Sequence, residues 1–202
     1  MRKKCFFIIL ALFISQNLFG NFYIQNKKSS LKFLKQACKI GKQEACFNLA
    51  ILYKKSMDSK SKRQDAIKIF QKICQENSSS ACLELGNSFL KAKDTKQNIK
   101  KSISYFSKAC KLNNSKACEK LGILNENEKY IRKDDKIAIS LFKKSCKLYD
   151  FKSCYDLGLL YAYTQNLKIQ NKLKAKRYFL KSCRNDIKNA CNDFNLLNQA
   201  GY

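Results

Sequence analysis

The chain has 202 residues and a formal charge of +26, from 41 Lys and Arg against 15 Asp and Glu, and it contains no histidine, proline or tryptophan. The absence of histidine excludes the commonest general base and the commonest metal ligand, so any metal would be bound by thiolates and carboxylates. The charge favours an acidic partner such as nucleic acid, a phosphorylated polymer or anionic lipid. The alternative is that the lysine- and asparagine-rich composition merely follows from an AT-rich genome.

The first twenty residues, MRKKCFFIILALFISQNLFG, have the pattern of a secretory signal peptide. Basic residues at 2–4 precede an apolar stretch over 5–14, which is short for a transmembrane helix. We expect cleavage after Gly20 and a periplasmic or secreted protein; the alternative is an uncleaved N-terminal anchor. Export permits disulfides, and cleavage would remove Cys5, leaving an even number of ten cysteines.

After a lead-in over residues 21–30, the sequence repeats. Five cysteine pairs, each with a spacing of eight, define the repeat, and the first cysteines of successive pairs are 36, 36, 36 and 37 residues apart. The pairs are Cys38 and Cys46, Cys74 and Cys82, Cys110 and Cys118, Cys146 and Cys154, and Cys183 and Cys191. A fixed period of this length predicts a solenoid. The expected repeats span 31–66, 67–102, 103–138, 139–175 and, as a truncated cap, 176–202.

Each repeat is predicted to contain two helices, A and B. Apolar residues seven, five and four positions before the first cysteine form one face of helix A. Four positions before it stand Leu34, Phe70, Phe106, Phe142 and Phe179. Helix B follows the second cysteine, and four positions after that cysteine stand Ala50, Gly86, Gly122, Gly158 and Asn195. Because glycine inside a helix costs about 1 kcal/mol, these positions predict close approach of a neighbouring helix.

The fifth repeat departs from this pattern at two places. Lys176 stands where the other repeats have leucine or isoleucine, and Asn195 stands at the small-residue position. Polar residues at such positions are typical of a terminal capping repeat.

The cysteine spacing sets a geometric condition on any disulfide. Residues eight apart in a straight helix are separated by about 12 Å, whereas a disulfide requires Cα atoms within about 7 Å. The chain must therefore reverse between helices A and B. Three positions after the first cysteine stand Gly41, Asn77, Asn113, Tyr149 and Asp186. Glycine and asparagine favour the left-handed turn that ends a helix, and Tyr149 breaks the series. Structural disulfides fit better than zinc sites or redox dithiols, which favour closer spacings.

The segment FSKACKLNNSKACEKLG, residues 106–122, resembles the Sel-one-like repeat, a relative of the tetratricopeptide repeat. Over about residues 31–202 the chain most resembles the secreted Helicobacter cysteine-rich proteins, whose repeats are similarly stapled. The resemblance implies an all-α fold, a right-handed α/α superhelix with a concave face for ligands. The chain departs from the family in the connections from helix B to the next helix A, which lack the glycine that is usual there. We therefore expect an exported scaffold that binds protein, peptide or envelope glycan, without a cofactor.

The helix B–helix A connections are predicted to fall on one edge and to form a basic ridge. Its residues are Lys60, Lys62, Arg63, Lys96, Lys100, Lys101, Arg132, Lys133, Lys136, Lys172, Lys174 and Arg177. This ridge is a possible polyanion site, and a solvated edge of lysines is the simpler alternative. Nucleic acid is an unlikely partner, because an exported protein does not meet it and no motif indicates it.

The resemblance also implies an enzymatic alternative, since members of the family are described as penicillin-binding proteins or β-lactamases. Catalytic residues are not identifiable in this chain. The S-x-x-K pattern starts at Ser29, Ser59, Ser88 and Ser140, as often as chance predicts, and S-D-N and K-T-G elements are missing. We therefore favour a non-enzymatic interaction protein.

Overall fold

The computed structural model describes residues 29–56, 59–91, 98–126 and 133–202. Within these ranges the chain forms helices and turns, and no strand. The expected signal peptide, 1–20, lies outside the described residues. The chain divides into two compact units, Met1–Ile69 and Phe70–Tyr202, so the boundary falls within one helix.

The first unit contains one complete helical hairpin. Its first helix covers residues 29–39 and is followed by α2, Gln43–Lys54. The helix that crosses the unit boundary is α3, Lys60–Gln75. Gly41 joins the two helices of the hairpin with a φ of 85°, a left-handed conformation that glycine adopts without strain.

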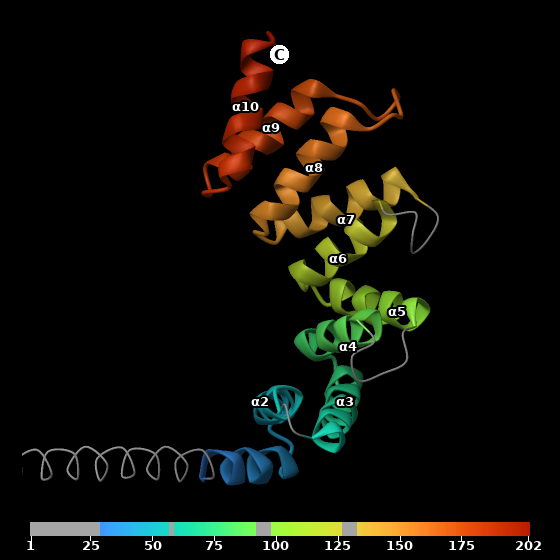
Figure 1. Cartoon of the computed structure of the whole chain (residues 1–202), viewed down its shortest axis with the longest axis vertical. Helices are drawn as coiled ribbons and strands as arrows, with labels where there is room; N and C mark the ends of the chain where they lie inside the picture. The colour runs from blue at the N-terminus through green and yellow to red at the C-terminus, as the bar shows by residue number, and fades with distance from the viewer. Residues whose placement is uncertain (1–28, 57–58, 92–97, 127–132) are drawn as a thin grey trace, which may run out of the picture. The chain divides into compact units, whose positions relative to one another are not determined.

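The second unit is a row of alternating B and A helices (Figure 1). They are α4 Ser79–Lys91, α5 Ile99–Lys111, α6 Ser115–Glu126, α7 Asp135–Lys147, α8 Phe151–Tyr163, α9 Lys172–Cys183 and α10 Lys188–Gln199. Each helix contacts the next one along the chain, and the most extensive contacts join a B helix to the A helix that follows it. The strongest packing is therefore between repeats.

The turns from helix A to helix B have the predicted left-handed residue. Its φ is 67° at Asn77, 62° at Asn113, 64° at Tyr149 and 64° at Asp186. At Asn113 the backbone N–H donates to the carbonyl of Cys110, and the next N–H donates to the carbonyl of Ala109. These two bonds form the Schellman motif that satisfies the last carbonyls of a helix. Tyr149 adopts the same conformation despite its bulky side chain.

A disulfide joins the two helices at each of the five turns. The bridges are Cys38–Cys46, Cys74–Cys82, Cys110–Cys118, Cys146–Cys154 and Cys183–Cys191. Their Cα–Cα distances lie between 4.5 and 4.9 Å, well within disulfide reach. Chain reversal, rather than a straight helix, therefore brings the cysteines together, as the spacing predicted.

The glycines of the B helices make room for a phenylalanine of the next A helix. A Cβ atom on Gly86 would lie 2.4 Å from the ring of Phe106, and one on Gly122 would lie 2.6 Å from the ring of Phe142. A Cβ atom on Gly158 would lie 2.5 Å from Phe179. All three phenylalanine side chains are fully buried. The prediction of a close helix approach at these glycines is confirmed.

Buried serines of the A helices add hydrogen bonds to the preceding B helix. Ser102 Oγ donates to the Gly86 carbonyl at 2.8 Å, and Ser182 Oγ donates to the Phe151 carbonyl at 2.9 Å. These bonds satisfy backbone carbonyls where the helices approach most closely. The all-α class, with five disulfide-stapled helical hairpins, is thus confirmed.

Candidate functional site

The predicted basic ridge lies where the A helices begin. Lys96 and Arg132 lie outside the described residues. Of the others, Lys60 and Arg63 are in the first turn of α3, Lys101 is in that of α5, and Lys174 is in that of α9. In the second unit the beginnings of α5, α7 and α9 lie along one side, to the right in Figure 1. This placement puts the basic residues of that unit on one edge.

Among the described ridge residues, three side chains have a hydrogen-bond or ion-pair partner within the protein. Arg63 Nη1 donates to the Ser56 carbonyl at 3.0 Å, and Lys172 Nζ donates to the Ala162 carbonyl at 2.7 Å. Lys133 Nζ lies 3.6 Å from Asp135 Oδ1. These three side chains help to fix the connections between helices.

Lysines of the ridge also cover stacked aromatic rings. Phe89 stacks on Tyr105 with 5.6 Å between ring centroids, and Lys101 Nζ lies 5.5 Å from the Phe89 centroid. The same arrangement recurs two repeats later, where Tyr161 stacks on Tyr178 at 5.9 Å and Lys174 Nζ lies 5.5 Å from the Tyr161 centroid. Such contacts between a cation and a ring contribute about 0.5–1 kcal/mol each at exposed sites. The two ring pairs could be predicted from the sequence, because their aromatic residues stand at equivalent positions of the repeat.

The sequence reasoning missed an acidic strip that runs over α6, the first residue of α7 and the N-terminal half of α8. The strip consists of Glu119, Glu126, Asp135, Asp150 and Asp156. At one end, two lysines form ion pairs with carboxylates of the neighbouring repeat. Lys152 Nζ lies 2.8 Å from Glu119 Oε1, and Lys116 Nζ lies 2.7 Å from Asp150 Oδ2. These hydrogen bonds raise the pKa of both lysines. A signal was available, because seven of the fifteen acidic residues fall between residues 119 and 156.

The rest of the strip holds carboxyl groups that resist ionisation. Burial raises the pKa of Asp156 to about 6, and the charges of Glu119 and Asp150 act in the same direction. Burial likewise raises the pKa of Glu126 to about 7, with a further contribution from Asp156. The Oδ2 atom of Asp156 is buried and has no hydrogen-bond partner. The strip is thus a cluster of like charges in which Glu126, Asp135 and Asp156 are half-buried.

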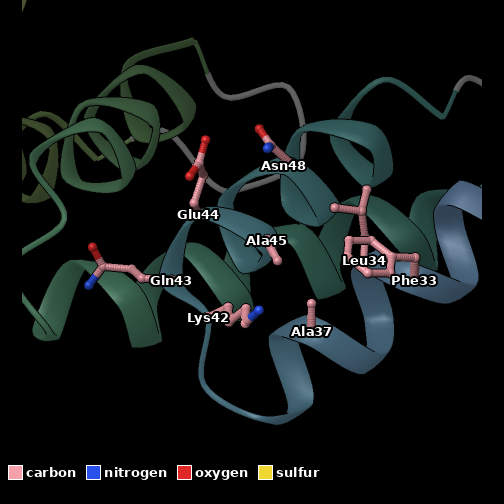
Figure 2. Close-up of a pocket in the computed structure, with 8 residues that line it drawn as sticks. All are labelled: Phe33, Leu34, Ala37, Lys42, Gln43, Glu44, Ala45 and Asn48. Carbon is pink, nitrogen blue, oxygen red and sulfur yellow. The ribbon is translucent and has the colours of Figure 1, made fainter.

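A pocket of about 390 Å³ opens on the hairpin of the first unit. Figure 2 shows Phe33, Leu34 and Ala37 on the first helix, with Ala45 of α2 facing them. Its polar lining residues are Lys42, Gln43, Glu44 and Asn48. The pocket therefore combines an apolar floor with a polar rim, and its volume suits a peptide side chain or a small ligand.

The pocket includes a position that packs against a helix in later repeats. Leu34 stands at the position of Phe106, Phe142 and Phe179, which the preceding B helix covers. In the first hairpin Leu34 lines the pocket, and its neighbour Phe33 is 67% exposed.

Two further properties concern metals and membranes. Within the described ranges, cysteine and carboxylate side chains nowhere gather in threes as a metal site requires. Over the same ranges, every helix is too short or too polar to cross a bilayer.

The repeated hairpins match a known family. The family described as Sel1 repeat matches residues 17–42, 43–78, 79–114, 115–150 and 152–187, which together cover most of the chain. The chain belongs to the Sel1 repeat family. The family pattern starts each repeat at the B helix, so its boundaries are shifted by half a repeat from the A-first division. No curated protein matches the sequence.

Solved structures agree with the Sel1 repeat assignment. Cysteine rich protein B of Helicobacter pylori is 33% identical, with a TM-score of 0.51, and the match covers 67% of this chain and 97% of that one. A Sel1 repeat protein from Oxalobacter formigenes is 23% identical with a TM-score of 0.69, covering 79% of this chain. A protective antigen of uropathogenic Escherichia coli with this fold is 19% identical with a TM-score of 0.70, covering 81%.

This Sel1 repeat protein is shorter than two of those neighbours. It spans 65% of the Oxalobacter protein and 35% of the Escherichia coli antigen. The disulfides and the Helicobacter neighbour place it in the cysteine-rich branch of the family. Sel1 repeats serve as scaffolds for protein–protein interaction, and disulfides at every turn are typical of an oxidising compartment outside the cytoplasm.

Proposed function

We propose that this Sel1 repeat protein is an exported scaffold that binds a protein or peptide partner through the open pocket of its first repeat. The observation that carries the proposal is the open pocket: Phe33 and Leu34, which line it, stand at positions that the later repeats use to pack a helix. An apolar segment of a partner would bury the same surface. An envelope glycan is the alternative occupant, bound through the polar rim.

The proposal is tested by affinity capture with the oxidised protein from residue 21 onward, against cell-envelope and host fractions at two salt concentrations. A charged side chain in the pocket, Phe33→Glu, should abolish capture of the partner. Ile40→Glu is the matched control, because Ile40 is 69% exposed in the same hairpin but does not line the pocket. Equal capture by the two variants would contradict the proposal.

A second candidate function is polyanion binding by the basic ridge. Cations in the first turn of a helix oppose the helix dipole, typically at a cost of about 0.3–1 kcal/mol each. The first turns of α3, α5 and α9 nevertheless carry basic residues and no acidic ones. An anionic polymer bound along this edge would offset the cost of these charges to the helices.

The ridge is tested by heparin binding as a function of salt. Replacing Lys100, Lys101, Lys172 and Lys174 with serine should lower the salt concentration of elution. The control replaces four exposed lysines at the opposite ends of the helices with serine, which changes the net charge equally: Lys39, Lys111, Lys147 and Lys188. If both sets lower elution equally, the binding reflects net charge and the ridge is not a site.

The β-lactamase alternative finds no support in the geometry of the S-x-x-K serines. Ser88 Oγ donates to the Glu84 carbonyl at 2.9 Å, and Ser140 Oγ donates to the Ile137 carbonyl at 2.8 Å. A nucleophilic serine would instead direct its proton to a base. Absence of nitrocefin turnover at micromolar protein is the expected result.

A further inference from the structure

The connection between α8 and α9, residues 164–171, has an unusual charge. The connection and the first half of α9, residues 164–177, contain four lysines, one arginine and no acidic residue, a local charge of +5. The other helix B–helix A connections, KSMDS at 55–59, AKDTKQ at 92–97 and NEKYIRKD at 127–134, each include aspartate or glutamate. The α8–α9 connection, TQNLKIQN, is thus the helix B–helix A connection that contains no acidic residue.

Apolar side chains are exposed in the midst of this charge. Leu167 is 80% exposed, Leu173 is 60% exposed and Tyr163 is 59% exposed. Ile169, only two residues from Leu167, packs against the buried cluster around Phe142 and Leu157. Ile169 therefore packs against the core, whereas Leu167 faces solvent.

Hydrogen bonds fix this end of the hairpin. The Asn171 N–H donates to the Tyr161 carbonyl at 2.8 Å, and Lys172 Nζ lies 4.8 Å from the Tyr163 ring centroid. Thr164 Oγ1 donates to Asp135 Oδ2, on the first residue of α7, at 2.7 Å. The connection extends past the ends of both helices (Figure 1). The exposed leucine is accordingly held at a protruding, positively charged end.

We propose that the α8–α9 connection docks on the surface of an anionic lipid bilayer, with Leu167 entering the interface and the surrounding lysines contacting lipid phosphates. An apolar tip within a basic surround is the combination that binds proteins peripherally to such membranes. A soluble polyanion would attract the lysines but would leave Leu167, Leu173 and Tyr163 in water. The arrangement thus fits a bilayer better than a soluble polymer.

The first experiment uses the absence of tryptophan from the chain. Leu167→Trp introduces the only tryptophan, at the tip, and its selectively excited emission should shift to the blue with vesicles of phosphatidylcholine and phosphatidylglycerol. Leu196→Trp is the matched control, because Leu196 is 58% exposed on α10, away from the connection. The readout is local, so it does not depend on residues 1–20. An unshifted emission at position 167, or equal shifts at both positions, would overturn the proposal.

The second experiment measures vesicle flotation of the chain from residue 21, which retains every described residue. Leu167→Ser with Leu173→Ser should weaken binding to anionic vesicles about tenfold, because burial of leucine is lost. Leu196→Ser should bind as the parent does. Heparin elution should be the same for all three proteins. Undiminished flotation of the double variant would show that charge alone drives binding, and would contradict docking of the connection.

Discussion

Five residues, one in each repeat, reverse the chain at left-handed φ, and their side chains differ in how well they tolerate it. Gly41 has no Cβ atom, and Asn and Asp visit this region more readily than other residues. Tyr149, at a φ of 64°, has neither advantage, and its side chain is exposed apart from an edge contact with Phe151. The turn therefore forms at Tyr149 because the flanking helices and the disulfide impose it.

We expect Tyr149→Gly to raise the free energy of unfolding by about 1 kcal/mol, because it removes the left-handed strain at little loss of contact. Urea unfolding of the oxidised protein measures the change. Asn113→Gly is the control and should change the stability by a few tenths of a kcal/mol. A destabilised Tyr149→Gly protein would show that the ring contact outweighs the strain.

We expect Gly122→Ala to lower the stability by about 1–3 kcal/mol, because the new Cβ atom would lie 2.6 Å from the buried Phe142 ring. Phe142→Leu in the same protein should recover part of the loss, and a double-mutant cycle in thermal unfolding measures the coupling. Ile123→Ala, at the exposed neighbouring position, is the control. If the stability changes of the Gly122 and Phe142 variants are additive, the two residues do not pack against each other.

Sequence reasoning predicted these residues because each leaves a periodic signal. Cysteines, turn residues and small residues recur at fixed positions, and their roles follow from local geometry. The hydrogen bonds of Ser102 and Ser182 to carbonyls of the preceding B helix were not predictable in the same way. Serine is as common on surfaces as in such contacts, so only the packed structure identifies its acceptor.

At the scale of helices, α6 and α8 bring together carboxyl groups that are distant in the sequence. Asp156 and Glu126 stand 30 residues apart, and only stacking of repeats places their charges within reach of each other. Lys152, Lys116 and Lys133 oppose the resulting repulsion in part. Repeat-by-repeat sequence reasoning missed the strip because its members occupy different repeat positions.

The strip predicts that the protein is more stable in mild acid. The pKa values of Asp156 and Glu126, about 6 and about 7, lie above those of the unfolded chain. The folded state thus binds more protons, and stability falls as the pH rises from about 4 to about 7. Both groups are partly exposed, so screening reduces the expected loss to about 1–2 kcal/mol.

The measurement is urea unfolding across that pH range. Asp156→Asn with Glu126→Gln should flatten the profile, and the absence of histidine removes a competing titration. Glu84→Gln, which removes a carboxyl group on α4 and leaves the strip intact, is the control. A parent protein that gains stability up to pH 7 would contradict the role of the strip.

At the scale of the whole molecule, disulfides at every turn replace the large core that a short helical hairpin lacks. Each bridge closes a loop of about nine residues and contributes roughly 2.5 kcal/mol in the chain-entropy account. The surfaces are then left for interaction: an open pocket, a basic ridge and a charged connection with an exposed leucine. The sequence predicted the repeats and the ridge, but the pocket forms between two packed helices, so its lining is visible only in the structure.

Disulfide mapping of the protein recovered from the producing cell tests the central claim, that an exported scaffold is stapled once in each repeat. Peptide mass spectrometry without reduction, after thiol blocking, should find all ten cysteines from Cys38 to Cys191 in five local pairs with a spacing of eight. Free thiols at these positions, or bridges that cross between repeats, would contradict it.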